Sequence, residues 1–284
     1  MRILIVNDDG IKAPGIRKLA ELSMKLGEVW VVAPKSQCSA MSQRITLFED
    51  IEVTPECYDV DGVRAYSVGG TPADCVKVAL EFLMPEKPDV VFSGINSGYN
   101  TGIDILYSGT VGAAMEALAN GIRSFAFSNK NDTSWETVDA YLISIVKELL
   151  DENLSMDRIW NVNFPGCKLS ECKGILRDRI PAKHQFYQDD YVRTNHADGS
   201  FSLRSKGVMT IPLLFFVWSL LHIIMEICRI RNPDTIHNDI IESISSQGFS
   251  TTFTKNKIFI LGLPIWKEMY YNGFRCSFNI FLFN

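Results

Sequence analysis

Short apolar runs alternate with helical patterns along the first 165 residues, and this alternation constrains the fold more than any other feature. The apolar runs cover residues 2–6, 29–33, 89–93, 124–128 and 158–164. The helical patterns between them cover residues 16–26, 74–84, 110–120 and 134–152, and Thr133 with Glu136 is typical of a capping box. Strands that are continuously apolar are buried on both faces. We therefore predict an α/β fold, a Rossmann-like, mostly parallel sheet with helices on both faces.

The net charge of −5 argues against a nucleic-acid-binding surface, which needs a basic excess. The seven cysteines form no C-x-x-C pair, and Met1 runs directly into a strand-like segment without a secretory signal. These features predict free thiols and a cytoplasmic location. Cys167, Cys172 and His184 fit no zinc template well, so we interpret them as loop residues.

Two adjacent acids follow the first predicted strand, in the turn Asn7-Asp8-Asp9-Gly10. Ligands of a parallel sheet bind beyond the carboxyl ends of its strands, so this turn lies where an active site is expected. Two carboxylates held together repel each other, and a hard divalent cation relieves that repulsion. A helix N-cap followed by a glycine turn is the plainer interpretation of the same four residues.

Three more polar loops are expected at the same edge of the sheet. The segment 33–42 carries Ser39 and Ser42, and the glycine-rich segment 93–102 carries Asn96, whose carbonyl oxygen suits magnesium or manganese. The turn at 107–112 opens a helix with backbone N–H groups and hydroxyls, as a phosphate site does. The segment 70–74 opens the preceding helix in a similar way. An acid pair, a serine loop, an asparagine and an anion-binding turn together indicate a metal-assisted phosphate hydrolase.

These segments resemble the SurE family of stationary-phase survival nucleotidases. The matching stretches are IVNDDG at 5–10, VVAP at 31–34 with the SAMS loop at 39–42, and GGTPADCV at 69–76. SGINSGYNTGIDILYSGTVGAAMEA at 93–117 and NVNFP at 161–165 follow in the family's order, and a looser match extends to about residue 203. The family usually has glycine where Ala40 stands.

The resemblance implies an α/β phosphatase that hydrolyses nucleoside 5′- and 3′-monophosphates, and sometimes short polyphosphate. It implies one divalent cation, Mg²⁺ or Mn²⁺, and a homo-oligomer. The metal ligands it implies are Asp8, Asp9, Ser39 and Asn96, and the phosphate-binding residues are Ser108, Gly109 and Thr110. As catalytic residues it points to Asp8 and Asp9, with attack either by a metal-activated water or by Asp8 itself.

The family pattern stops after Gly207, and the composition changes there. Residues 208–284 hold 13 of the 31 aromatic residues and 13 isoleucines. We expect a phosphatase domain over 1–207 and a divergent segment over 208–284, either an added helix or the product of a shifted reading frame. The apolar run 211–227 is interrupted by polar residues, which argues against a membrane span. Because the carboxyl-terminal region helps to build the family's oligomers, the departure weakens the expectation of assembly.

Two other functions compete with the nucleotidase. A phosphate-sensing receiver domain also begins with a strand and paired acids, but it needs an aspartate after its third strand, where this chain has Gly94 and Ile95. A catalytically impaired relative that binds nucleotide or phosphate without turnover is the second.

Overall fold

The computed structural model describes residues 1–130, 134–152, 157–183, 187–188, 190–206, 208–209, 250–254 and 257–261. The chain divides into two compact units, the first formed by residues 1–187 and the second beginning at Gln188. The predicted helix or membrane run at 211–227 and His184 lie outside the described residues. The boundary expected at residue 207 stays a prediction.

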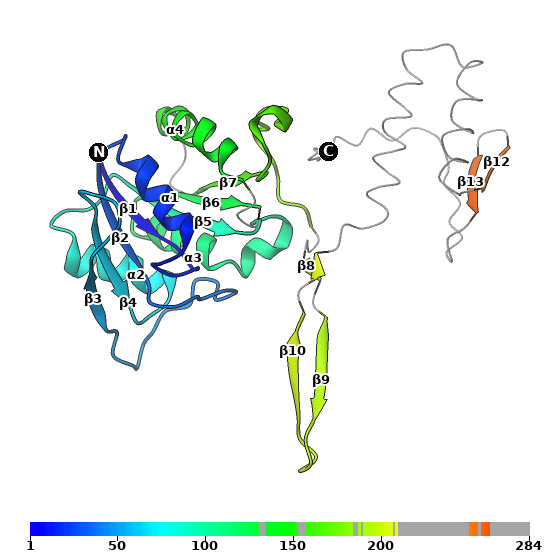
Figure 1. Cartoon of the computed structure of the whole chain (residues 1–284), viewed down its shortest axis with the longest axis horizontal. Coiled ribbons are helices and arrows are strands. Elements are labelled where there is room, and N and C mark those ends of the chain that lie inside the picture. The colour runs from blue at the N-terminus through cyan, green and yellow to red at the C-terminus, as the bar shows by residue number, and fades with distance from the viewer. Residues whose placement is uncertain are drawn as a thin grey trace. The chain divides into compact units, whose positions relative to one another are not determined.

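A seven-stranded sheet forms the centre of the first unit, in the order β3-β4-β2-β1-β5-β6-β7 (Figure 1). All neighbouring strands are parallel except β3, which runs antiparallel to β4 at the edge. The strands are β1 (Arg2–Val6), β2 (Glu28–Pro34), β3 (Val53–Glu56), β4 (Arg64–Val68), β5 (Val90–Ser97), β6 (Arg123–Asn129) and β7 (Trp160–Phe164). The predicted α/β fold is confirmed.

Helices cover both faces of this sheet. On one face, Ile16 and Leu19 of α1 and Leu142 of α4 pack with Ile3 and Ile5 of β1. On the other face, residues of α2 and α3 pack against the alternate side chains of the same strand. The helices are α1 (Pro14–Ser23), α2 (Pro72–Val78), η1 (Ala79–Leu83), η2 (Gly102–Leu106), α3 (Gly109–Ala119), α4 (Glu136–Asp151) and η3 (Leu169–Glu171). Because successive side chains of a strand point to opposite faces, a continuous apolar run is what such a two-sided core requires.

Several observed boundaries differ from the predicted ones. The strand expected at 89–93 runs on to Ser97, after a bulge between Ser93 and Asn96. The helix expected at 74–84 is divided into α2 and a π-helical turn, η1. Thr133, half of the expected capping box with Glu136, lies outside the described residues; α4 begins after Trp135 without a side-chain cap, and the Glu136 carboxylate accepts from the backbone N–H of Leu169.

The second unit contains a hairpin of β9 (Tyr191–Asn195) and β10 (Phe201–Ser205), whose residues are all exposed. The Arg193 guanidinium lies 3.9 Å from the centre of the Phe201 ring, a cation–π contact across the two strands. This hairpin is the segment of looser family resemblance. The remaining short strands are β8 (Tyr187–Gln188), β11 (Val208–Met209), β12 (Ser250–Thr254) and β13 (Lys257–Leu261). In the described part of the chain, no helix has both the length and the apolar character that a bilayer crossing needs.

Candidate active site

The predicted site lies where the strand order of the sheet reverses. The chain leaves β1 toward β2 on one side, and β5 pairs with β1 on the other. Ligands of open α/β sheets bind at this switch point, outside the carboxyl ends of the strands. The turn after β1 is held by Asn7, whose side-chain amide donates to the Gly10 carbonyl at 2.9 Å. Gly10 has a φ of 96°, a conformation that favours glycine.

Asp9 connects three segments that are far apart in the sequence. One carboxylate oxygen accepts from the backbone N–H of Ser97 at 3.0 Å. The other lies 3.5 Å from the side-chain nitrogen of Gln37, which also donates to the Ser39 hydroxyl at 3.0 Å. The predicted residues Asp9 and Ser39 therefore lie beside each other, and Asn96 is the immediate neighbour of the residue that Asp9 contacts.

Asp8 points toward the start of α3. Its side chain is buried, and one oxygen accepts from the Thr110 hydroxyl at 2.6 Å. The backbone of Thr110 also donates to this carboxylate, and a Cβ on Gly109 would lie 2.9 Å from the Asp8 Cβ. Glycine at position 109 is what lets the helix begin so close to the acid.

Burial raises the pKa of Asp8 to about 6, because desolvation penalises the charged carboxylate more than the Thr110 hydrogen bond favours it. The negative charge of Asp9 raises the pKa of Asp8 further. A buried acid that is destabilised by a second acid is the situation in which a cation lowers the free energy most.

The donor atoms of this cluster fit a hard divalent cation. Asn96 donates through its side-chain nitrogen to the Gly98 carbonyl at 2.8 Å. The side-chain oxygen of Asn96 therefore points away from Gly98 and is not used in this hydrogen bond. Two carboxylates, one amide oxygen and one hydroxyl are all oxygen ligands, the kind that Mg²⁺ and Mn²⁺ take. No cluster of three or more His, Cys, Asp or Glu side chains occurs in the described ranges, so the neutral oxygens of Ser39 and Asn96 are needed to complete such a site.

The two similar helix starts at this edge are built differently. At α2, Thr71 and Asp74 form a capping box, and the Asp74 carboxylate also accepts from the backbone and hydroxyl of Thr46. At α3, Ser108 accepts from the Val111 N–H at 3.1 Å, and the acid at the helix start is Asp8. The polar groups at the start of α2 are thus paired by the carboxylate of that helix, Asp74. The start of α3 is paired instead with Asp8 of the candidate site. Phosphate binding by Ser108, Gly109 and Thr110 stays a prediction.

Of the two candidate serines in the 33–42 segment, Ser39 and Ser42, only Ser39 is joined to the acid pair. Ser42 donates its hydroxyl to the Leu106 carbonyl at 2.7 Å and its backbone N–H to the Tyr107 carbonyl at 3.0 Å. It holds the segment against the connection into α3. Ala40, where the family usually has glycine, has a φ of 57°, a left-handed conformation that L-residues adopt at a cost of roughly 1 kcal/mol.

Sequence reasoning missed the residues that hold the cluster together. Gln37 was not singled out, and neither was the network around Asn100. The Asn100 N–H donates to the Asn163 side-chain oxygen at 2.9 Å, and the side-chain amides of Asn161 and Asn163 both donate to the Asn100 carbonyl. Two asparagines at alternate positions of one strand were the available signal, because β7 places such residues on the same face.

An α/β sheet with paired acids, neighbouring neutral side-chain oxygens and a helix start at its switch point is the arrangement of a hydrolase. Residues 3–185 match the family model described as Survival protein SurE. The chain belongs to the SurE family.

Individual relatives agree with this assignment. The chain is 46% identical over 212 residues to a protein named 5′-nucleotidase SurE from Clostridium botulinum, an alignment that covers 73% of this chain and 82% of that relative. It is 43% identical over 186 residues to the protein of the same name from Carboxydothermus hydrogenoformans, covering 63% of this chain and 70% of the relative. The crystal structure of the SurE protein from Aquifex aeolicus superimposes with a TM-score of 0.61 at 35% identity, covering 74% of this chain and 83% of that one.

Proposed function

We propose that this chain is a metal-dependent 5′-nucleotidase that hydrolyses nucleoside monophosphates to nucleoside and phosphate. The observation that carries the proposal is the position of Asp9, which contacts the Ser97 N–H and the Gln37 amide that also binds Ser39. The loop after β2 and the end of β5 both contact this carboxylate, and the neighbouring carboxylate of Asp8 is buried with a raised pKa. The names of the relatives from two bacterial genera support the choice of substrate.

In this proposal Asp8, Asp9, Ser39 and Asn96 hold one Mg²⁺ or Mn²⁺. The cation supplies Lewis-acid polarisation of the phosphoryl group and lowers the pKa of a water that it binds. The side chains of the protein have separate tasks. Thr110 keeps Asp8 oriented through its hydroxyl, and Gln37 keeps Asp9 and Ser39 together.

The start of α3 receives the phosphate group of the substrate. The N-terminal end of a helix carries a partial positive charge, and its backbone N–H groups point outward. Charge that develops on the phosphoryl oxygens is therefore stabilised at Ser108, Gly109 and Thr110. The same proposal extends to 3′-monophosphates and short polyphosphate, which expose the same terminal phosphate group.

The test is release of phosphate from AMP and GMP by the purified full chain, with and without added Mg²⁺ or Mn²⁺. We expect release that depends on the metal and stops with chelator. A folded chain that binds AMP but releases no phosphate with either metal would instead be the impaired relative. Acid quenching during turnover followed by borohydride reduction adds the identity of the nucleophile, since direct attack by Asp8 forms an acyl phosphate that borohydride reduces to an alcohol at position 8, whereas attack by water leaves the Asp8 carboxylate unchanged.

A further inference from the structure

A pocket of about 250 Å³ lies beside the candidate active site and shares none of the residues proposed for catalysis. It sits at the carboxyl ends of β2 and β4, beside the antiparallel edge strand β3. Ser67 of β4 is paired with Thr54 of β3, and both line the pocket. The other lining residues are Ile11, Lys12, Lys35 and Glu56.

This pocket exists because α1 does not reach the edge of the sheet. Ala33 and Ala65 belong to the core beneath α1, and Ser67, two residues beyond Ala65 in β4, faces the same side. α1 packs on β1, β2 and β5, so the β4–β3 edge extends past the helix on this face. The loops after β1 and β2 then close the space, joined by the hydrogen bond from the Ile11 N–H to the Pro34 carbonyl at 2.9 Å.

Ser67 is the sharpest sign that a polar ligand belongs here. Its side chain is 1% exposed, and within the described residues its hydroxyl has no hydrogen-bond partner. A buried hydroxyl without a partner destabilises the protein, because it has lost its hydrogen bonds to water without replacement. A ligand oxygen in the pocket removes that destabilisation.

Two positively charged side chains, Lys12 and Lys35, line the pocket and favour an anionic ligand. Among the described residues, Lys12 makes no ion pair that competes for its ammonium group. Lys35 contacts the exposed carboxylate of Glu52 at 2.7 Å, and exposed pairs of this kind are easily exchanged. The pocket volume is smaller than that of most sites for drug-sized ligands, which suits a compact anion.

Glu56 narrows the choice of anion, because a carboxylate in the same pocket repels an anion unless that anion carries a proton to donate. Hydrogen phosphate keeps at least one P–OH group at neutral pH, whereas sulfate has none. We propose that this pocket is a second, non-catalytic site that binds inorganic hydrogen phosphate, with Lys12 and Lys35 on its charged oxygens, Ser67 donating to it and Glu56 accepting its proton.

The pocket is distinct from the catalytic site, but its lysines lie close to the proposed metal ligands along the chain. Lys12 lies three residues after Asp9, and Lys35 lies four residues before Ser39. If the proposed function holds, inorganic phosphate is the product of the reaction. Product bound in this pocket then contacts the two loops that carry Asp9 and Ser39. The existence of the pocket site does not depend on that function.

The test is calorimetric titration of the full chain with inorganic phosphate in the presence of chelator, which removes the proposed metal, and the lysine variants then separate this pocket from the start of α3. We expect saturable binding that sulfate does not reproduce. Lys35→Gln and Lys12→Gln each weaken it about tenfold, since each removes a charge-assisted hydrogen bond. Glu52→Gln strengthens it, because it frees Lys35.

Asp9→Asn is the control at the catalytic site, and phosphate binding under chelator is expected to survive that change. Failure of the proposed function alone therefore leaves this titration unaffected. The inference is overturned by an absence of binding to the unmodified chain, by equal binding of sulfate, or by lysine variants that bind as the unmodified chain does.

Discussion

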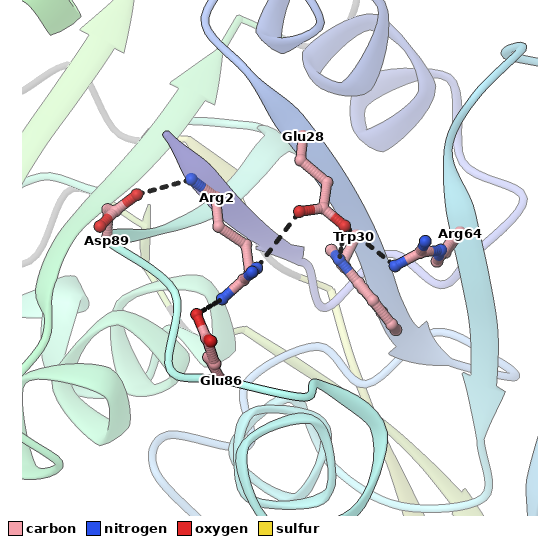
Figure 2. A network of polar contacts seen from close by, with 6 residues as sticks. All are labelled: Arg2, Glu28, Trp30, Arg64, Glu86 and Asp89. Atoms are coloured by element: carbon pink, nitrogen blue, oxygen red, sulfur yellow. Dashed lines mark hydrogen bonds and ion pairs between the residues drawn. The ribbon is translucent and has the colours of Figure 1, made fainter.

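The parallel strands of the central sheet begin at one side, here called the amino edge, and end at the other, the carboxyl edge. The two sides use the same residue types for opposite purposes. At the amino edge, Arg2 lies between Glu86 and Glu28 at 2.9 and 3.2 Å, and Arg64 contacts Glu28 at 2.9 Å (Figure 2). Each carboxylate there has a cation or another donor beside it. At the carboxyl edge, Asp8 and Asp9 lie next to each other and receive neutral donors.

This difference appears in the protonation of the acids. At the amino edge, the hydrogen bonds from Trp30 and then Arg2 lower the pKa of Glu28 below its usual value. At the carboxyl edge, burial raises the pKa of Asp8 to about 6. The acids at the amino edge are compensated by their own partners, whereas an added cation at the carboxyl edge would lower the free energy of the two acids, as expected of a binding site.

The largest expected effect comes from the same substitution made at both edges. Asp9→Asn removes a proposed metal ligand, so metal-dependent phosphate release should fall by about a thousandfold or more, the equivalent of several kcal/mol of transition-state stabilisation. Asp89→Asn at the amino edge alters the carboxylate that accepts from the Arg2 N–H and should leave kcat unchanged. Similar activity in the two variants would contradict the assignment of the site.

The second prediction concerns stability without metal. Because the pKa of Asp8 in the folded chain is above its unfolded value, the folded state binds the proton more tightly between about pH 4 and pH 6. Stability therefore falls as the pH rises through that window, by roughly 3 kcal/mol in total, and stays level above it.

Asp8→Asn should remove this slope and stabilise the metal-free chain at pH 7 by up to about 3 kcal/mol, while abolishing turnover. Urea unfolding in chelator at pH 4 and pH 7 measures both variants. Added Mg²⁺ or Mn²⁺ should stabilise the unmodified chain and leave Asp8→Asn unaffected. Equal pH slopes in the two chains would show that Asp8 is not the destabilised acid.

The third prediction tests how α3 holds Asp8. Thr110→Val keeps the shape of the side chain but removes the hydroxyl that donates to Asp8 at 2.6 Å. We expect kcat to fall by about tenfold, the equivalent of a hydrogen bond to a charged group, with a smaller change in KM. Thr110→Ser, which retains the hydroxyl, is the matched control and should keep most of the activity.

A smaller effect is expected at Ala40, where the carboxyl edge stores backbone strain. Ala40→Gly relieves the left-handed conformation but makes the unfolded chain more flexible. The net gain in stability should be below about 1 kcal/mol. Thermal unfolding measures it. A destabilised variant would mean that the loop tolerates Ala40 without strain.

The smallest effect is expected from Glu28→Gln at the amino edge. It removes ion pairs with Arg2 and Arg64 that are exposed and screened by salt. The melting temperature should fall slightly at low ionic strength and be unchanged at high ionic strength, with kcat unaffected. A change in kcat would show that the ion pairs at the amino edge affect the reaction at the carboxyl edge, and would contradict the separate roles of the two edges.

The sequence predicted the central strands well because buried parallel strands are continuously apolar. It missed β3 and β4, since neither has such a run: β3 contains Pro55, and β4 begins with the exposed Arg64. It also ended β5 too early. The chain continues as strand through Ser97 because residues 96–97 pair with Ser128 and Asn129 of β6 after the bulge, a partner that lies about 30 residues away.

At the site, positions after strands indicated Asp8, Asp9 and Asn96 together with the Ser39–Ser42 loop, and the family resemblance chose Ser39. The structure brings these segments together. It did not separate Ser39 from Ser42, because a loop's direction depends on what it contacts. Nor could it assign Thr110 to Asp8, a hydrogen bond between residues 102 apart. Such pairings depend on tertiary packing, which no local pattern contains.

The long sequence separations within the site affect how the chain refolds. The contacts of Asp9 with Ser97 and of Asp8 with Thr110 join residues 88 and 102 apart. Contacts of that range form only after large loops have closed, so they form late compared with the helices. During refolding, helical circular dichroism should therefore recover before the site does, and enzymatic activity should report the moment at which the sheet has closed between β1 and β5.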